Sequence, residues 1–231
     1  MLDFILPIEE HCDKGFSAVA DQYKNFAEHA LEHNFPTTML EALPICFSLR
    51  HASELYLKSV ITIIHIICND SFPDNKVPMI KIEGKERNLY SIHSLKELLD
   101  YVNTYLRDNS GFFDFENKTD WLATPKYLIR SINKIDSMDR NSAYFRYSIT
   151  QANRIDVEKS PMEEVPINFI PKKDSVGSFN TILVDSNKKV VRAFTSKDDD
   201  KKVKETLDHL VRIKDNLIGI PYGLKYEYLR N

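Results

Sequence analysis

Glycine is scarce in this chain, and long apolar segments are absent from it. Only six glycines occur among 231 residues, which disfavours an all-β fold built on tight turns. The most apolar run, from Val60 to Cys68, contains His65 and falls well short of the roughly 20 residues that a membrane helix needs. The first residues lack the basic segment of a signal peptide. These absences predict a helical protein of the cytoplasm that does not enter a membrane.

Cysteine is rare as well. Cys12, Cys46 and Cys68 form no CxxC pair, and an odd count in apolar surroundings favours free thiols over disulfides. His29 and His33 have the spacing of two metal ligands on one helix, but with no third ligand recognised beside them we predict ordinary surface histidines. The chain also lacks a glycine-rich phosphate loop and an HExxH motif. We therefore expect no metal and no cofactor.

The charge is nearly balanced. Thirty-one Lys and Arg residues face 34 Asp and Glu residues, for a net charge of -3. A globally basic nucleic-acid binder is thereby disfavoured, whereas a local basic cleft remains open. With 42% hydrophobic residues, the chain has enough apolar side chains for the core of one large domain.

Apolar residues recur at steps of three and four, the period of an amphipathic helix. Pro44 interrupts the second of these segments, so we expect a kink or a restart there. Ser94, with Glu97 three residues later, predicts a capping box at the start of the third. The helices are expected over about 9–33, 37–68, 91–106, 118–138 and 198–217.

Between the last two helices the pattern changes. Residues 180–185 and 190–194 flank a short polar turn and predict a β-hairpin, the proline-rich stretch 156–178 is expected to be irregular, and residues 144–147 are expected to be extended. The predicted fold class is mainly α. It is a bundle of about four or five helices in a single domain over residues 1–231, with an irregular and β-hairpin insertion at about 156–195 before the last helix.

A row of charges crosses the most apolar helix. Arg50, Glu54 and Lys58 follow one another at four-residue steps, with His51 beside them. The flanks of this helix are also apolar, so it is expected to be mostly buried, and a buried charge is costly unless it is paired. Three interpretations stay open. Arg50 or Arg146 pairs with Glu54 or Asp139 and holds the bundle together, or the row holds a dimer together, or it works on a substrate.

Three short motifs follow one another along the chain. They are Arg50-His51-x-x-Glu54-Leu55-x-Leu57-Lys58 in the long apolar helix, His93-Ser94-Leu95 at the start of the next, and Phe145-Arg146-Tyr147 after an Asp-Ser segment. In this order, over about residues 10–220, the chain resembles the HEPN superfamily of prokaryotic helical-bundle proteins. The resemblance implies a dimeric bundle from a toxin–antitoxin or antiviral defence system. It also implies an antitoxin or another defence protein as partner.

The first hypothesis drawn from this resemblance is a protein that cleaves or binds RNA as a homodimer. In such a metal-independent ribonuclease a histidine handles the proton and an arginine stabilises charge on the phosphate. The charge of Arg50 is expected to lower the pKa of His51, which favours a neutral base. The expected catalytic residues are Arg50, His51, Glu54, His93 and Arg146, and the expected RNA-binding residues are Lys58, Tyr144 and Tyr147.

The alternative hypothesis is a catalytically inactive HEPN-like scaffold or regulatory subunit that binds a protein partner or a nucleotide. It rests on a departure from the family pattern, because no histidine follows an arginine by four to six residues on a late helix. Arg87 and His93 have the right spacing but precede the third helix.

Overall fold

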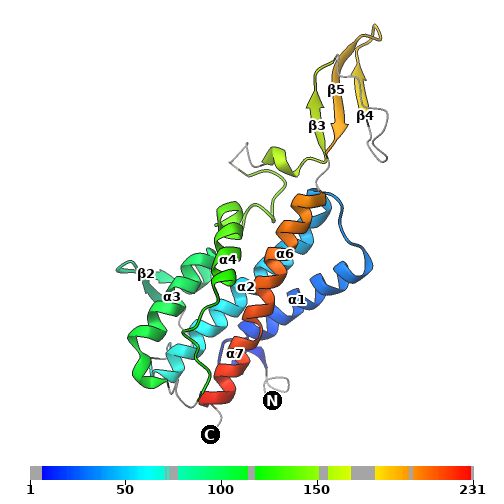
Figure 1. Cartoon of the computed structure of the whole chain (residues 1–231). Helices are drawn as coiled ribbons and strands as arrows, with labels where there is room; N and C mark the ends of the chain where they lie inside the picture. The colour runs from blue at the N-terminus through cyan, green and yellow to red at the C-terminus, as the bar shows by residue number, and fades with distance from the viewer. Residues whose placement is uncertain are drawn as a thin grey trace.

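The protein is a helical bundle with two small antiparallel sheets (Figure 1). The structure is a computed structural model that describes residues 7–70, 72, 78–113, 118–150, 156–167, 180–197 and 200–229. The predicted mainly α class, with a small β-hairpin before the long helix near the C-terminus, is confirmed. The helices are α1 (Phe16–His33), α2 (Met39–Ile67), α3 (Leu95–Asp108), α4 (Lys126–Asp139), α6 (Asp200–Leu217) and α7 (Gly219–Leu224).

Helix α2 is the centre of the bundle. It contacts α1, α3, α6 and α7, while α4 packs against α3 and α6. Residues 52–65 of α2 are buried without interruption, so the burial expected from its apolar flanks is confirmed. The helix continues through Pro44, and the restart considered for that position does not occur.

Two helices begin later than their apolar periodicity suggests. Helix α1 begins at Phe16, because Gly15 is left-handed at φ 76° and the Asp13 carboxylate accepts from the amides of Gly15 (3.2 Å) and Ser17 (3.0 Å). Helix α4 begins at Lys126, not at residue 118. Its N-cap is Pro125, whose extended backbone separates it from the preceding segment.

The region after α6 differs from expectation. The helix ends at Leu217 as predicted, but Gly219 opens the short helix α7 instead of closing the helical region. Leu224 and Pro221 of α7 are buried against the bundle. Apolar contacts therefore extend the helical structure past a glycine that sequence patterns treat as a stop.

Both sheets are antiparallel. Strands β1 (Met79–Ile82) and β2 (Lys85–Asn88) form a hairpin around Glu83 and Gly84, whose φ values of 50° and 80° fit a two-residue turn of type I′. Strands β3 (Met162–Val165), β4 (Asn180–Val184) and β5 (Val190–Ser196) form the second sheet in the order β3-β5-β4.

The second sheet corresponds to the predicted insertion. Its β4–β5 hairpin is confirmed, whereas β3 lies in the stretch that was expected to be irregular. Residues 168–178 of that stretch lie outside the described residues. Figure 1 shows the sheet extending away from the bundle beyond the N-terminal end of α6. None of the helices in the described part of the chain is long and apolar enough to span a membrane.

The segment after α4 is a turn, so the extended conformation expected for residues 144–147 is wrong. The Asp139 carboxylate accepts from the Tyr144 amide (2.7 Å), and the Tyr147 amide donates to the Ala143 carbonyl (3.0 Å). Ser142 adopts a left-handed φ of 56°, which reverses the chain between these two contacts. The turn buries Tyr144 and Phe145 and leaves Tyr147 exposed.

Candidate functional site

A cluster of five polar residues lies where α2, the segment before α3 and the end of α4 meet. We call Arg50, Glu54, Lys58, His93 and Asp139 the polar cluster. Arg50, Glu54, Lys58 and Asp139 are 0%, 1%, 3% and 3% exposed, whereas the His93 side chain is 38% exposed. Four of its members are thus removed from solvent.

Arg50 is the centre of this cluster. Its guanidinium donates to the Glu54 carboxylate, to the His93 carbonyl oxygen and, at 3.4 Å, to the Asp139 carbonyl oxygen. Its Nε lies 3.3 Å from Asp139 Oδ2 as an ion pair, although the angle is unsuitable for a hydrogen bond. The predicted pairing of Arg50 with Glu54 or Asp139 is confirmed with both, so one guanidinium joins three segments.

Glu54 completes the cluster on α2. Lys58 Nζ donates to Glu54 Oε1 (2.6 Å) and to the Tyr90 carbonyl oxygen (3.1 Å), and His93 Nδ1 lies 3.1 Å from the same Oε1. The carboxylate therefore has Arg50 on one oxygen and Lys58 with His93 on the other. This arrangement provides the pairing and hydrogen bonding that a buried charge requires.

The pKa values of the two carboxylates in the cluster are shifted in opposite directions. Burial raises the pKa of Glu54, but the hydrogen bond to His93 and the charges of Arg50 and Lys58 outweigh it and hold the pKa at about 2. Burial raises the pKa of Asp139 above its ordinary value, and the Arg50 charge offsets this only in part. Burial lowers the pKa of Lys58, against the attraction of Glu54.

A second group of residues lies at the surface beside the cluster. We call Phe47, His51, Arg146 and Tyr147 the aromatic–arginine surface. His51 stacks on Phe47 with ring centroids 5.5 Å apart, and the Arg146 guanidinium lies 5.2 Å from the Phe47 centroid and 6.0 Å from that of Tyr147. Tyr147 is 53% exposed. The surface therefore offers a ring and a cation to solvent.

The predicted fall in the pKa of His51 is confirmed in direction. Burial is its largest cause; Arg50 and Arg146 lower the pKa further, while the Glu54 carboxylate raises it. The neutral ring is thereby favoured. Sequence reasoning named the Arg50 charge and missed the larger effect, because burial depends on how Tyr23 and Phe47 pack around the ring.

Next to this surface is a cleft of about 800 Å³. Its lining includes Arg140, Asn141, Tyr147 and Thr150, together with backbone and side chains at the end of α4. The volume lies within the range of roughly 300–1,000 Å³ that small-molecule sites occupy. The cleft was not anticipated from the sequence, since the turn that shapes it was expected to be extended.

The structure separates the predicted site residues into two sets. Arg50, Glu54, Lys58 and His93 are brought together, but the first three are inside the protein. Tyr144 is also buried, at 3% exposed, with its ring 4.5 Å from Lys159 Nζ. Four of the predicted site residues are at least partly exposed to solvent: His51, His93, Arg146 and Tyr147.

The formally matching pair Arg87 and His93 is not joined by a contact in the described part of the chain. Arg87 Nη1 donates to Glu97 Oε2 (2.7 Å), whereas His93 Nδ1 is turned to Glu54. Glu97 also pairs with Arg140. Ser94 caps α3 through the Glu97 amide (3.1 Å), and the second half of the expected capping box is replaced by these two arginines.

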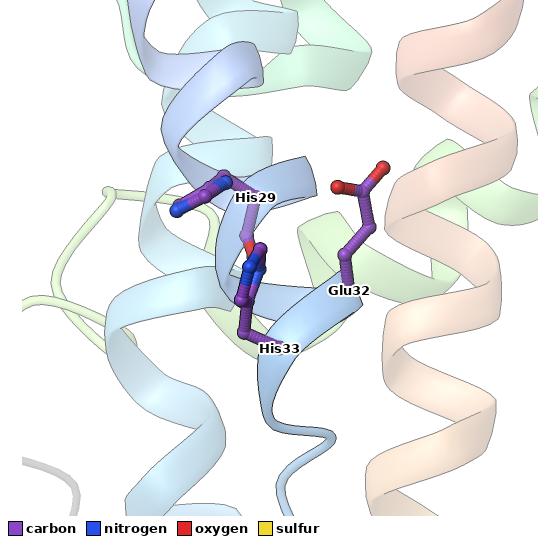
Figure 2. Close-up of side chains that lie close together, drawn as sticks. All are labelled: His29, Glu32 and His33. Atoms are coloured by element: carbon purple, nitrogen blue, oxygen red, sulfur yellow. The ribbon is translucent and has the colours of Figure 1, made fainter.

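A further group of possible ligands lies at the end of α1 (Figure 2). His29, Glu32 and His33 are all exposed, and their donor atoms lie within 4.8 Å of one another. The two histidines were considered as a metal pair, and Glu32 was missed. Its position three residues after His29 was the available signal, because residues at i, i+3 and i+4 share one face of a helix.

Comparison with protein-family models, curated proteins and solved structures finds no match for this chain.

Proposed function

We propose that this protein is a HEPN-like helical protein that binds RNA as a homodimer without cleaving it. The observation that carries the proposal is the burial of the charged row. Arg50, Glu54 and Lys58 are at most 3% exposed, and each is paired within the protein. In this proposal the polar cluster defines the fold, and the aromatic–arginine surface binds the ligand.

Cleavage that used the charged row would require Arg50 to reach a phosphate. That movement would break its contacts to Glu54, Asp139 and the His93 carbonyl at once. Breaking one partner away from a buried ion pair costs roughly 3–5 kcal/mol, because it leaves an uncompensated charge. An arginine with these contacts is suited to joining helices and poorly suited to stabilising the charge that develops on a phosphate during cleavage.

The aromatic–arginine surface has the chemistry for binding without cleavage. An exposed Tyr147 ring can stack on a base, and the Arg146 guanidinium beside it can pair with a phosphate. Stacking on an aromatic side chain contributes roughly 1–3 kcal/mol per base. The adjacent cleft provides room for the nucleotide that follows.

A second candidate is a regulatory protein that binds a single nucleotide. The cleft of about 800 Å³ favours it, since Tyr147 and Arg140 lie on its walls and its size suits one small ligand. The two candidates differ in how affinity depends on ligand length. An RNA-binding surface gains affinity with each added nucleotide, whereas a single-nucleotide cleft does not.

Binding of labelled single-stranded RNA, measured by fluorescence anisotropy in EDTA at fixed salt, tests the proposal. We expect RNA of about ten nucleotides to bind more tightly than a mononucleotide and to remain intact on a gel. Tyr147→Ala should weaken binding at least about fivefold, the lower limit of a stacking contact, and Arg146→Ala should weaken it through the lost pairing with a phosphate. Arg212→Ala and Tyr226→Ala, at exposed positions on α6 and near the C-terminus, are the matched controls.

Three results would contradict the proposal. Cleavage that His93→Ala abolishes would restore the ribonuclease hypothesis. Equal affinity for a mononucleotide and for longer RNA would favour the nucleotide-binding alternative. Unchanged RNA binding in both Tyr147→Ala and Arg146→Ala would exclude the aromatic–arginine surface.

A further inference from the structure

We propose that His29, Glu32 and His33 form a surface site for a divalent transition-metal ion of the zinc type. The three side chains lie on the last turns of α1 (Figure 2). None of the three belongs to the aromatic–arginine surface, so metal binding here is independent of RNA binding.

The helix itself brings the three ligands together. Residues at i, i+3 and i+4 lie on one face, and the rings of His29 and His33 are 4.1 Å apart between centroids. Their donor atoms and a Glu32 oxygen lie within 4.8 Å of one another. Two ligands of one tetrahedral zinc ion, each bound at about 2.0–2.1 Å, are separated by roughly 3.4 Å. Each pair of ligand atoms therefore needs to approach by at most roughly 1.5 Å, which small changes in the side-chain torsion angles of these exposed residues supply.

The hydrogen bond of His33 is suited to metal binding through Nε2. Its Nδ1 lies 2.8 Å from the carbonyl oxygen of His29, which can only accept a hydrogen bond. In the neutral ring Nδ1 must then carry the proton, and Nε2 keeps its lone pair for the ion. A backbone carbonyl that holds the other ring nitrogen is the usual support of a metal-binding histidine.

The position on the helix favours a cation. His33 is the last residue of α1, and the C-terminal end of a helix carries partial negative charge from its free carbonyl groups. The Glu32 carboxylate adds a full negative charge. The neighbouring Lys214 is directed to Glu28, one turn earlier on α1, with Nζ 2.6 Å from its carboxylate.

Two imidazoles and one carboxylate are the protein ligands of open zinc sites, in which water takes the fourth position. All three side chains are exposed, so binding an ion requires no opening of the fold. The chemistry of the ligands selects zinc and its neighbours, copper and nickel, over magnesium and calcium, which prefer oxygen ligands alone.

Zinc binding to the untagged, metal-free protein tests this site. The experiment uses Cys12→Ser as the parent, because the exposed thiol of Cys12 is a competing zinc ligand. Titration followed by calorimetry should show one zinc ion per chain. His29→Asn and His33→Asn should each lower the affinity at least about tenfold, and Glu32→Gln should also weaken it. Copper bound in place of zinc should give an electron paramagnetic resonance spectrum with two nitrogen ligands.

The matched control keeps the composition and changes the face of the helix. His33→Asn combined with Asn34→His moves one imidazole a residue further along the chain, and we expect it to bind as weakly as His33→Asn alone. Wild-type affinity in this double variant would overturn the proposal, as would unchanged binding in Glu32→Gln or an absence of stoichiometric zinc in the parent. Each metal-free variant should unfold at the same midpoint temperature as the parent protein, which shows that the affinities compared are those of folded proteins.

Discussion

At the scale of single residues, Arg50 shows how a charge can be required inside an apolar helix. Its guanidinium donates to groups from α2, from the segment before α3 and from the end of α4. A planar group with five donors can satisfy three directions at once, which lysine cannot. Arg50 therefore connects elements that are distant in sequence, and Glu54 keeps its charge from being uncompensated.

Replacing Glu54 with glutamine tests this role. Glu54→Gln should lower the free energy of unfolding at pH 7 by roughly 3–5 kcal/mol, because Arg50 and Lys58 lose their shared partner in a buried site. Urea unfolding gives the measurement. Glu205→Gln, on the exposed face of α6, is the control and should change stability by less than about 0.5 kcal/mol.

The loss of stability in Glu54→Gln should depend on pH. The pKa of Glu54 is about 2 in the folded protein against an ordinary value of 4.5, so its charge stabilises the fold above pH 4.5. This contribution is lost as the pH falls from 4.5 towards 2, where wild-type Glu54 is also neutralised. The deficit of Glu54→Gln should therefore shrink over that window. A deficit that is small at pH 7, or constant between pH 7 and pH 3, would show that the ion pairs do not hold the fold.

At the scale of elements, helix ends depend on side chains that the periodicity does not report. Helix α2 begins where Thr38 and Glu41 form a reciprocal capping box, and α1 begins where Asp13 and Gly15 interrupt the apolar pattern. The turn at 144–147 depends on an Asp139 contact made from the preceding helix. Strand β3 exists because β5 pairs with it from about thirty residues away. Such contacts explain why the helix centres were predicted better than their boundaries.

The cap of α2 provides a test at this scale. The Thr38 hydroxyl accepts from the Glu41 amide (3.3 Å), and the Glu41 carboxylate accepts from the amides of Thr37 (3.0 Å) and Thr38 (3.4 Å). Thr38→Ala should lower the free energy of unfolding by about 1 kcal/mol, because it leaves a helix donor without its partner. Thr38→Ser keeps the oxygen and should retain most of the stability. Equal urea midpoints for the two variants would show that the cap contributes nothing.

At the scale of the whole molecule, the last residues close one end of the bundle. Glu227 accepts from the Trp121 indole (3.0 Å) and from the Thr119 hydroxyl (2.5 Å), and its carbonyl accepts from Lys118. These contacts join the segment before α4 to the chain end, across more than a hundred residues. Trp121 also packs against Gly223, where a Cβ would come within 2.5 Å of the ring.

The single tryptophan reports on this closure. Glu227→Ala removes the partner of the Trp121 indole, so the fluorescence emission should shift to longer wavelength as water reaches the ring. We expect a loss of about 1–2 kcal/mol in the free energy of unfolding, the usual cost of an unmatched hydrogen bond. Glu205→Ala should change neither quantity. An unchanged emission maximum in Glu227→Ala would mean that packing alone holds Trp121.

The sequence by itself determined the mainly helical class, the buried course of α2 and the β4–β5 hairpin, because each depends on a local repeat of apolar residues. It also predicted that Arg50 or Arg146 pairs with Glu54 or Asp139, since a charge inside an apolar helix requires a partner. The structure shows Arg50 paired with both carboxylates. Only the tertiary structure decided which charged side chains of the predicted site are buried and which are exposed to solvent. Burial depends on α3, α4 and the turn at 144–147 meeting α2, and those contacts join residues far apart in the chain. Because the charged row is buried and Arg146 and Tyr147 are exposed, the candidate binding surface consists of Arg146 and Tyr147 and excludes the charged row.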